Sequence, residues 1–163
     1  EPTQDSMVDL VREGANVLVT RTFSKIFGLA GMRVGYGMGR PDIIDRVRNH
    51  IMAWPNGIGL TAAFHSYEDQ AFIAFSRQKV LQGRAMVEKT LRDAGFAPVQ
   101  SEANFVFVDI GRDAQAFREA MGREGVLING GYAGYPTYIR VSMGKLEDLE
   151  VFDRVFKRVI ARA

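Results

Sequence analysis

The sequence predicts an α/β protein, because segments with the pattern of strands alternate along the chain with segments that have the pattern of helices. Short runs that consist mainly of aliphatic and aromatic residues, typical of buried strands, occur at residues 17–19, 105–108 and 138–141. An amphipathic segment at residues 146–162 repeats its apolar positions at spacings of three and four, as a helix does. Strands interleaved with helices are typical of α/β domains.

The first part of the chain is expected to contain two short helices and two strands. The first helix has Asp5 or Ser6 as its N-terminal cap. Pro41 is expected to open the second helix, because a proline at the first helical position gives up no hydrogen bond. The expected elements are a helix at 5–11, a strand at 16–20, a strand at 34–38 and a helix at 41–48.

The remainder of the chain is expected to begin with one long helix. Apolar residues recur at spacings of three and four from Leu60 onward, and Gly95 provides a stop signal. A helix of this length would connect two domains. The elements expected after it are a strand at 105–108, a helix at 114–123, strands at 126–128 and 138–141, and a helix at 146–162.

A glycine-rich segment that follows the first strand, residues 22–35 (TFSKIFGLAGMRVG), contains a lysine among residues whose side chains bind phosphate well. Thr22 and Ser24 precede Lys25, and Arg33 follows it. A deprotonated lysine forms Schiff bases with aldehydes, and hydroxyl and guanidinium groups donate to phosphate oxygens. Glycine lets the backbone approach a ligand closely. The segment therefore predicts a nucleophilic amine beside a bound phosphate group.

The same segment resembles the cofactor-lysine segment of fold-type I pyridoxal-phosphate aminotransferases of class I and II, most of all the histidinol-phosphate aminotransferase group. In that family the lysine holds the cofactor as a Schiff base, and the hydroxyls and the arginine hold its phosphate. The resemblance implies that Lys25 is the catalytic lysine and the general acid and base. It also implies that Thr22, Ser24, Lys25 and Arg33 bind pyridoxal 5'-phosphate.

The resemblance extends over essentially the whole chain, but it covers only the second half of the family's length. It implies that residues 1–75 are the remainder of the large cofactor-binding domain, with a mostly parallel sheet and helices. Residues 76–163 are then a small C-terminal α/β sandwich domain, joined to the first by the long helix. The family's phosphate loop and its residues around the pyridine ring lie upstream of the match. The chain is therefore expected to be a fragment that is inactive alone.

A second segment, residues 138–144 (YIRVSMG), resembles the family's segment whose arginine binds the α-carboxylate of the substrate. A guanidinium group offers two parallel donors that match a carboxylate, which an ammonium group does not. The resemblance therefore implies that Arg140 is a substrate-binding residue.

Asn129 departs from the family pattern at a place where the substrate is expected to bind. In the histidinol-phosphate enzymes the strand that matches residues 126–128 ends in an arginine that helps to bind the substrate phosphate, and here Asn129 takes its place. A neutral amide does not form the charge-assisted pair of an arginine, so the resemblance does not carry histidinol phosphate over as the substrate. Trp54, Tyr132 and Tyr135 are expected either to line an apolar or aromatic substrate pocket or to pack at a surface or interface.

The composition narrows the range of partners. The 163 residues carry a net charge of +2 and contain no cysteine, which excludes a disulfide scaffold and fits a reducing cytoplasm, the expected location. So small a charge does not predict a nucleic-acid partner, and no apolar run is long enough to predict a membrane span. His50 and His65 lie in helical segments without the spacing of a metal-binding pair, so no metal is predicted.

The resemblance implies that the function is the transfer of an amino group between an L-amino acid and a 2-oxo acid, through Lys25 and pyridoxal phosphate, in a homodimer. Two alternatives remain open. The same fold supports pyridoxal-phosphate-dependent decarboxylases and lyases, such as threonine-phosphate decarboxylase, because the outcome depends on which Cα bond is aligned. A non-catalytic aminotransferase-like domain that senses an effector is the other alternative.

Overall fold

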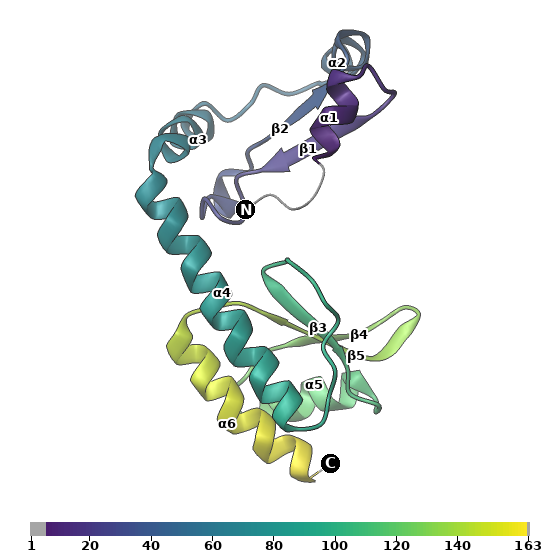
Figure 1. Ribbon diagram of the computed structural model, residues 1–163, viewed down its shortest axis with the longest axis vertical. Helices are drawn as coiled ribbons and strands as arrows, with labels where there is room; N and C mark the ends of the chain where they lie inside the picture. The colour runs from purple at the N-terminus through teal and green to yellow at the C-terminus, as the bar shows by residue number, and fades with distance from the viewer. Residues whose placement is uncertain (1–5, 163) are drawn as a thin grey trace. The chain divides into compact units, whose positions relative to one another are not determined.

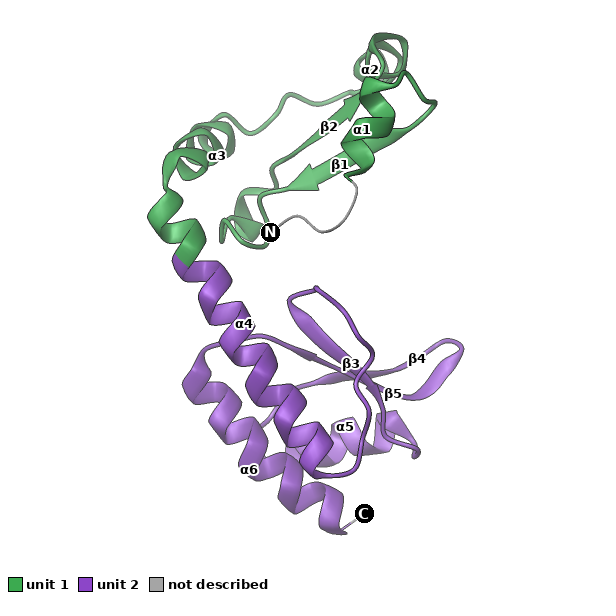
Figure 2. Ribbon diagram, viewed as in Figure 1, with its two compact units in different colours: residues 1–74 green, residues 75–163 purple. Residues whose placement is uncertain are grey.

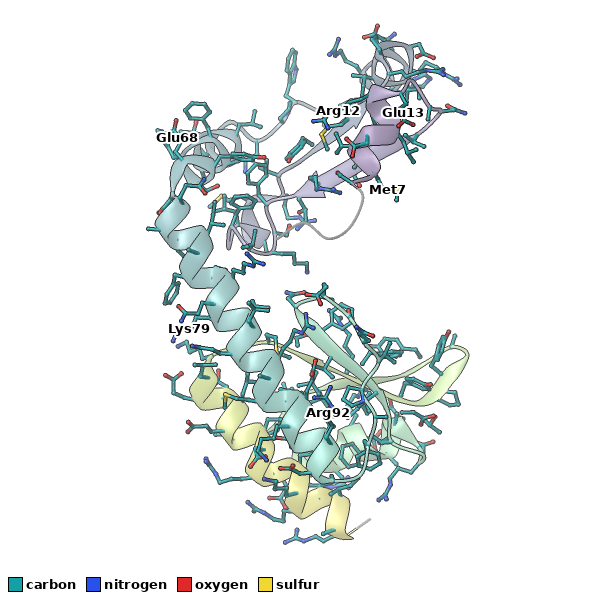
Figure 3. All side chains as sticks on the ribbon, in the orientation of Figure 1. Met7, Arg12, Glu13, Glu68, Lys79 and Arg92 are labelled. Carbon is teal, nitrogen blue, oxygen red and sulfur yellow. The ribbon has the colours of Figure 1, made fainter. Side chains whose placement is uncertain are left out.

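The computed structural model describes residues 6–162 and divides into two compact units, residues 1–74 and 75–163 (Figures 1 and 2). Unit 1 contains α1 (Met7–Arg12), β1 (Leu18–Thr22), the single 3-10 turn η1 (Ala30–Met32), β2 (Gly35–Gly39), α2 (Pro41–Arg48) and α3 (Gly57–Glu68). Helix α4 (Gln70–Asp93) begins in unit 1 and continues into unit 2, where Lys79 and Arg92 mark its course (Figure 3). Unit 2 adds β3 (Phe105–Asp109), α5 (Ala114–Arg123), β4 (Asn129–Tyr132), β5 (Tyr135–Ser142) and α6 (Leu146–Arg162).

Several predicted helix ends are confirmed. Ser6 caps α1, because its side chain accepts a hydrogen bond from the backbone N–H of Val8. Asp5, the alternative cap, lies outside the described residues. Pro41 is the first residue of α2, and Gly95 follows α4 with a φ of +86°, a conformation that glycine adopts readily.

The prediction of one long helix from Leu60 is wrong, because the chain leaves the helical conformation at Asp69 and forms α3 and α4 instead. Asp69 has φ −80° and ψ 74°. Its Oδ1 accepts a hydrogen bond of 2.9 Å from the backbone N–H of Phe72, which caps the first turn of α4. A side chain that offers the backbone its own partner competes with continuation of the helix.

The sheet of unit 1 consists of β1 and β2 in antiparallel pairing, with Thr22 opposite Gly35 at its end. None of the strands between residues 6 and 162 forms a parallel pair, so this segment does not supply the parallel pairing expected for the large domain. The buried core of the unit is small and consists of Phe23, Val34 and Ala63.

The sheet of unit 2 has three antiparallel strands in the order β3-β5-β4. Alternate residues of β3 and β5 are buried against the helices, namely Val106, Val108, Ile139 and Val141. Helix α6 occupies the predicted residues, and all positions of its predicted apolar face are buried: Leu149, Phe152, Val155, Phe156 and Val159. One face of the sheet is therefore covered by helices, and the unit is an α/β sandwich as predicted.

The predicted strand at residues 126–128 is wrong, because strand pairing begins only at Asn129. The backbone N–H of Val126 donates instead to the carbonyl oxygen of Met121 at 3.0 Å, in the turn that ends α5. Gly125 enters this turn with a φ of +84°. The start of the apolar run is thus used to close a helix.

Candidate active site

The predicted catalytic lysine lies in the loop between β1 and β2, called here the lysine loop (residues 23–34). The hydroxyl of Thr22 donates to the hydroxyl of Ser24 at 2.8 Å and accepts the backbone N–H of Ser24 at 3.0 Å. Phe23, between them, is buried on the other side of the chain. The alternation therefore places two hydroxyl groups side by side immediately before Lys25, where both can bind one anion.

Phe23 anchors the lysine loop to the core of unit 1. Its ring centroid lies 4.8 Å from that of Phe27 and 5.8 Å from that of Tyr67. Its backbone N–H donates to the carbonyl oxygen of Val34 at 3.1 Å, and its own carbonyl accepts the N–H of Leu29 at 3.0 Å. The two ends of the loop are thus held together.

Arg33 adopts a left-handed backbone conformation near the end of the lysine loop, with φ 55° and ψ 47°. Among residues 6–162 it is the one non-glycine residue with a positive φ. This conformation costs a residue with a Cβ atom about 1–2 kcal/mol. Its Nη1 donates to the carbonyl oxygen of Ala30 at 2.9 Å, which helps to fix the guanidinium. Backbone strain of this kind recurs where function requires one side-chain placement.

Helix α3 packs closely on the lysine loop through Asn56 and Gly59. Asn56 caps the helix by accepting the N–H of Gly59 at 3.2 Å, and its Nδ2 donates to the carbonyl oxygen of Met32 at 3.4 Å. A Cβ atom on Gly59 would lie 2.6 Å from Cγ2 of Val34 and 3.0 Å from the oxygen of Met32. Only glycine permits this approach.

The side chain of Lys25 is exposed, and within the described part of the chain its amine has no hydrogen bond or ion pair. Unit 1 thus offers an unpartnered amine, two adjacent hydroxyls on Thr22 and Ser24, and the guanidinium of Arg33, on the end of β1 and the lysine loop that follows it. This donor set fits a phosphate ester that carries an aldehyde, which is the chemistry of pyridoxal phosphate.

The second predicted site residue, Arg140, lies on β5, the central strand of unit 2. It pairs across the sheet with Phe107 of β3 and Asn129 of β4, so these side chains share the face opposite the buried valines. Its guanidinium carbon lies 4.2 Å from the centroid of the Phe105 ring, and its Nε is buried without a hydrogen-bond partner. Arg140 therefore has donor capacity that the described protein atoms do not use.

The structure brings Asn129 and Arg140 together, but Trp54 belongs to the other unit. Asn129 and Arg140 line a hollow of about 310 Å³ on unit 2. Trp54 is 97% exposed and lines a hollow within unit 1. Tyr132 and Tyr135 pair with each other across the hairpin of β4 and β5.

Phe105 and Phe107 are neighbours of Arg140 that were not predicted from the sequence. Both alternate with Val106 and Val108, which are buried in the core. Because successive side chains of a strand point to opposite faces, this alternation indicates that the two phenylalanines face away from the helices. Their position beside Arg140 depends on strand register, which local sequence does not reveal.

Neither a metal-binding group of side chains nor a membrane-spanning helix is found among the described residues, 6–162. No group of three or more histidine, aspartate or glutamate side chains among them is placed to hold a metal ion. None of the helices in this range has the length and hydropathy needed to cross a membrane.

The chain belongs to the class I and II aminotransferase family. The model of that family, described as "Aminotransferase class I and II", matches residues 2–155. The resemblance drawn from residues 22–35 is thereby confirmed. The cofactor of this family is pyridoxal phosphate.

Individual relatives are histidinol-phosphate aminotransferases. The chain is 38% identical over 156 residues to that of Moorella thermoacetica, covering 93% of this chain and 40% of the relative. A crystal structure from Erwinia carotovora atroseptica, provisionally named as this enzyme, has a TM-score of 0.93 and 29% identity, covering 99% of this chain and 47% of that one. The enzyme of Sinorhizobium meliloti, solved with pyridoxal-5'-phosphate, has a TM-score of 0.76 and 32% identity, covering 90% and 42%. The chain thus spans less than half the length of these relatives.

Proposed function

We propose that the polypeptide to which this chain belongs is a pyridoxal-phosphate-dependent aminotransferase that moves an amino group between an L-amino acid and a 2-oxo acid. The observation that carries this proposal is the lysine loop, where exposed Lys25 follows two hydroxyls that lie 2.8 Å apart. Membership of the family supports it, because the family uses this cofactor. The activity is proposed for the whole polypeptide, since the chain spans less than half the length of its relatives.

In this proposal unit 1 holds the cofactor. Thr22, Ser24 and Arg33 would hold its phosphate by donating hydrogen bonds, and the amine of Lys25 would condense with its aldehyde, with the aldehyde oxygen leaving as water. When bound, pyridoxal phosphate supplies an electron sink for the Cα bond that breaks. The free amine of Lys25 would act as the general base that accepts the proton of the substrate Cα, and the resulting ammonium would then act as the general acid.

Unit 2 would orient the substrate. Arg140 binds the α-carboxylate through its two-point donor geometry, and its unpartnered Nε supports this role. Asn129, its cross-strand neighbour, offers an amide but no charge to the substrate side chain. We therefore propose a substrate without a phosphate group at this position. Trp54, with its exposed ring, is the third proposed substrate-binding residue.

The proposal includes a homodimer, a cytoplasmic location and two domains, at residues 1–75 and 76–163. Met52 and Trp54 are fully exposed and Ile58 is largely exposed, and exposed large apolar side chains support association with a second subunit. The division into compact units after residue 74 supports the domain boundary.

The test is to incubate the complete polypeptide with pyridoxal phosphate, a panel of L-amino acids and 2-oxoglutarate, and to measure both glutamate and carbon dioxide. The proposal predicts glutamate without carbon dioxide. Lys25→Arg retains the charge but should abolish turnover, whereas Lys79→Arg on α4 should not change it. Carbon dioxide without glutamate would establish the decarboxylase alternative, and neither product would favour a non-catalytic domain.

A further inference from the structure

The side of unit 2 that carries the helices has a hollow of about 500 Å³, called here the helix-side hollow, between α5 and the last turns of α6. The two helices pack against each other within unit 2 (Figure 2). None of the lining residues belongs to the candidate active site. Arg140 points to the opposite face of the sheet, because the residues on either side of it on β5 are buried against the helices.

The middle of the helix-side hollow is apolar. Ala116 and Ala120 lie four residues apart on α5, so they share one face of the helix and leave the space above it open. Phe117 and Val159, which are almost fully buried, add apolar surface from α5 and α6. A ligand in this space would therefore lie mostly against carbon atoms.

Arg112 lies where the helix-side hollow begins, in the turn between β3 and α5. Gly111 enters this turn with a φ of +64°, and its backbone N–H donates to Oδ1 of Asp109 at 2.9 Å. Nη1 of Arg112 is buried and has no hydrogen-bond partner, and no carboxylate among residues 6–162 forms an ion pair with this guanidinium. A buried donor without a partner costs free energy, so Arg112 has binding capacity that the described protein atoms do not use.

The two carboxylates that line the helix-side hollow already have partners. Asp113 caps α5 by accepting a backbone N–H of its first turn at 2.7 Å. Glu124 accepts hydrogen bonds from Arg158 at 2.9 Å and from Arg162 at 3.1 Å. Arg123, in contrast, forms no ion pair within the part of the chain that the structure describes. Three guanidinium groups and two carboxylates thus line the hollow, an excess of one positive charge.

We propose that the helix-side hollow binds a small organic anion, in which one carboxylate is attached to an apolar chain. The carboxylate accepts hydrogen bonds from the guanidinium of Arg112, and the chain lies against Ala116, Ala120 and Val159. An inorganic anion would leave the apolar middle of the hollow in water, and an uncharged ligand would leave Arg112 without a counter-charge. The volume of about 500 Å³ is typical of small-molecule sites.

The test compares three small molecules on the complete polypeptide. Hexanoate has both the carboxylate and the apolar chain, acetate has only the carboxylate, and hexanamide has the chain without the charge. Their affinities are measured by saturation-transfer NMR titration in an Arg140→Gln background, so that the arginine proposed to bind the substrate cannot bind the probes. The proposal predicts that hexanoate binds at least about tenfold more tightly than either acetate or hexanamide. If either of these bound as tightly as hexanoate, the proposal would be overturned.

Two variants in the same background locate the site. Arg112→Gln should weaken hexanoate at least about tenfold, because the charge-assisted pair is lost. Arg118→Gln is the matched control, since Arg118 also belongs to α5 but does not line the helix-side hollow, and it should change nothing. Ala116→Phe should also weaken hexanoate about tenfold, because its ring fills the hollow. Ala116 is exposed, so this substitution is not expected to disturb the core.

Hexanoate that bound Arg112→Gln and Ala116→Phe as tightly as Arg118→Gln would lie elsewhere on the protein, and the proposal would be wrong. The result does not depend on the proposed amino transfer, which is measured separately as glutamate formation and requires Lys25. Each of the two proposals can therefore fail while the other stands.

Discussion

The two units of the chain hold their site residues by different means. In unit 2, Arg140 lies on the central strand of a sheet whose other face is buried against three helices, with side chains such as Phe156 and Leu91 fully enclosed. In unit 1, the core consists of Phe23, Val34 and Ala63. In unit 2, a sheet backed by helices holds the proposed substrate arginine. In unit 1, local hydrogen bonds and backbone conformations hold the proposed cofactor loop.

The exposed surface of unit 1 fits this difference. Large apolar side chains lie open on it, among them Ile51 at 60%, Ile58 at 75% and Phe64 at 66% exposed. Burial of apolar area is the main favourable contribution to folding, so unit 1 gains little from its own core. We expect unit 2 to unfold separately from unit 1 and at a higher denaturant concentration.

The largest effect on stability is expected from a matched pair of phenylalanine substitutions. Phe156 is 0% exposed and its ring contacts those of Phe96, Phe117 and Phe152. Phe156→Ala should lower the free energy of unfolding of unit 2 by about 3–5 kcal/mol in a urea titration followed by circular dichroism. Phe23→Ala should remove the structure of unit 1 and leave the transition of unit 2 unchanged. If both variants shifted the unfolding transitions of both units together, the two units would not unfold separately.

A second pair tests whether α3 fixes the lysine loop. Gly59→Ala should lower the free energy of unfolding of unit 1 by about 1–3 kcal/mol, because the added Cβ atom would lie 2.6 Å from Cγ2 of Val34. Gly57→Ala in the same helix is the control, since a Cβ atom there meets nothing within 4 Å. In the complete polypeptide, Gly59→Ala should also weaken the binding of pyridoxal phosphate, measured by equilibrium dialysis. Equal behaviour of the two variants would show that the close approach of α3 is unimportant.

Arg33 allows stability and binding to be separated. Arg33→Gly should raise the free energy of unfolding of unit 1 by up to about 1 kcal/mol, because glycine adopts a φ of 55° without strain. The same variant should weaken cofactor binding, because the guanidinium is lost. Arg33→Lys, which keeps a charge but not the fork, should bind with intermediate affinity. Stabilisation without loss of binding would remove Arg33 from the proposed phosphate site.

The smallest effect concerns a polar contact between α4 and α6. Burial disfavours ionisation of Asp153, but hydrogen bonds from Lys157 and Thr90 outweigh it and lower the pKa of its carboxyl group. A pKa lowered in the folded state stabilises the fold above the unfolded value of about 3.9, and this contribution is lost as the pH falls below it. Unfolding of unit 2 at pH 6 and pH 3 should therefore differ less in Asp153→Asn than in the wild type. If the difference in unfolding free energy between pH 6 and pH 3 were the same in Asp153→Asn and the wild type, the stabilising role of the Asp153 carboxylate would be contradicted.

The elements that the sequence predicted well are those set by local residues. Pro41 opens α2 and Gly95 follows the end of α4, because each residue acts through its own backbone torsions. The break at Asp69 was missed, because the apolar spacing continues across it while the side chain of Asp69 caps the next helix. The spacing of the apolar residues alone did not reveal that the capping side chain of Asp69 would interrupt the helix.

The same distinction between local and long-range effects applies to the candidate site. The order of Thr22, Ser24 and Lys25 indicated the lysine loop, because these residues are neighbours in the chain. The contact between the rings of Phe107 and Tyr132 was not predicted, because these residues meet only through strand register and its shift beside Gly131. Pairing between distant strands is a tertiary property that a local motif does not contain.

Attachment of pyridoxal phosphate to Lys25 can be measured by borohydride reduction of the complete polypeptide with bound pyridoxal phosphate, followed by peptide mass spectrometry. A phosphopyridoxyl group is expected on the peptide that contains Lys25, and it should be absent from a Lys25→Ala variant. Modification spread equally over exposed lysines such as Lys79 and Lys89, with none preferred at Lys25, would contradict it.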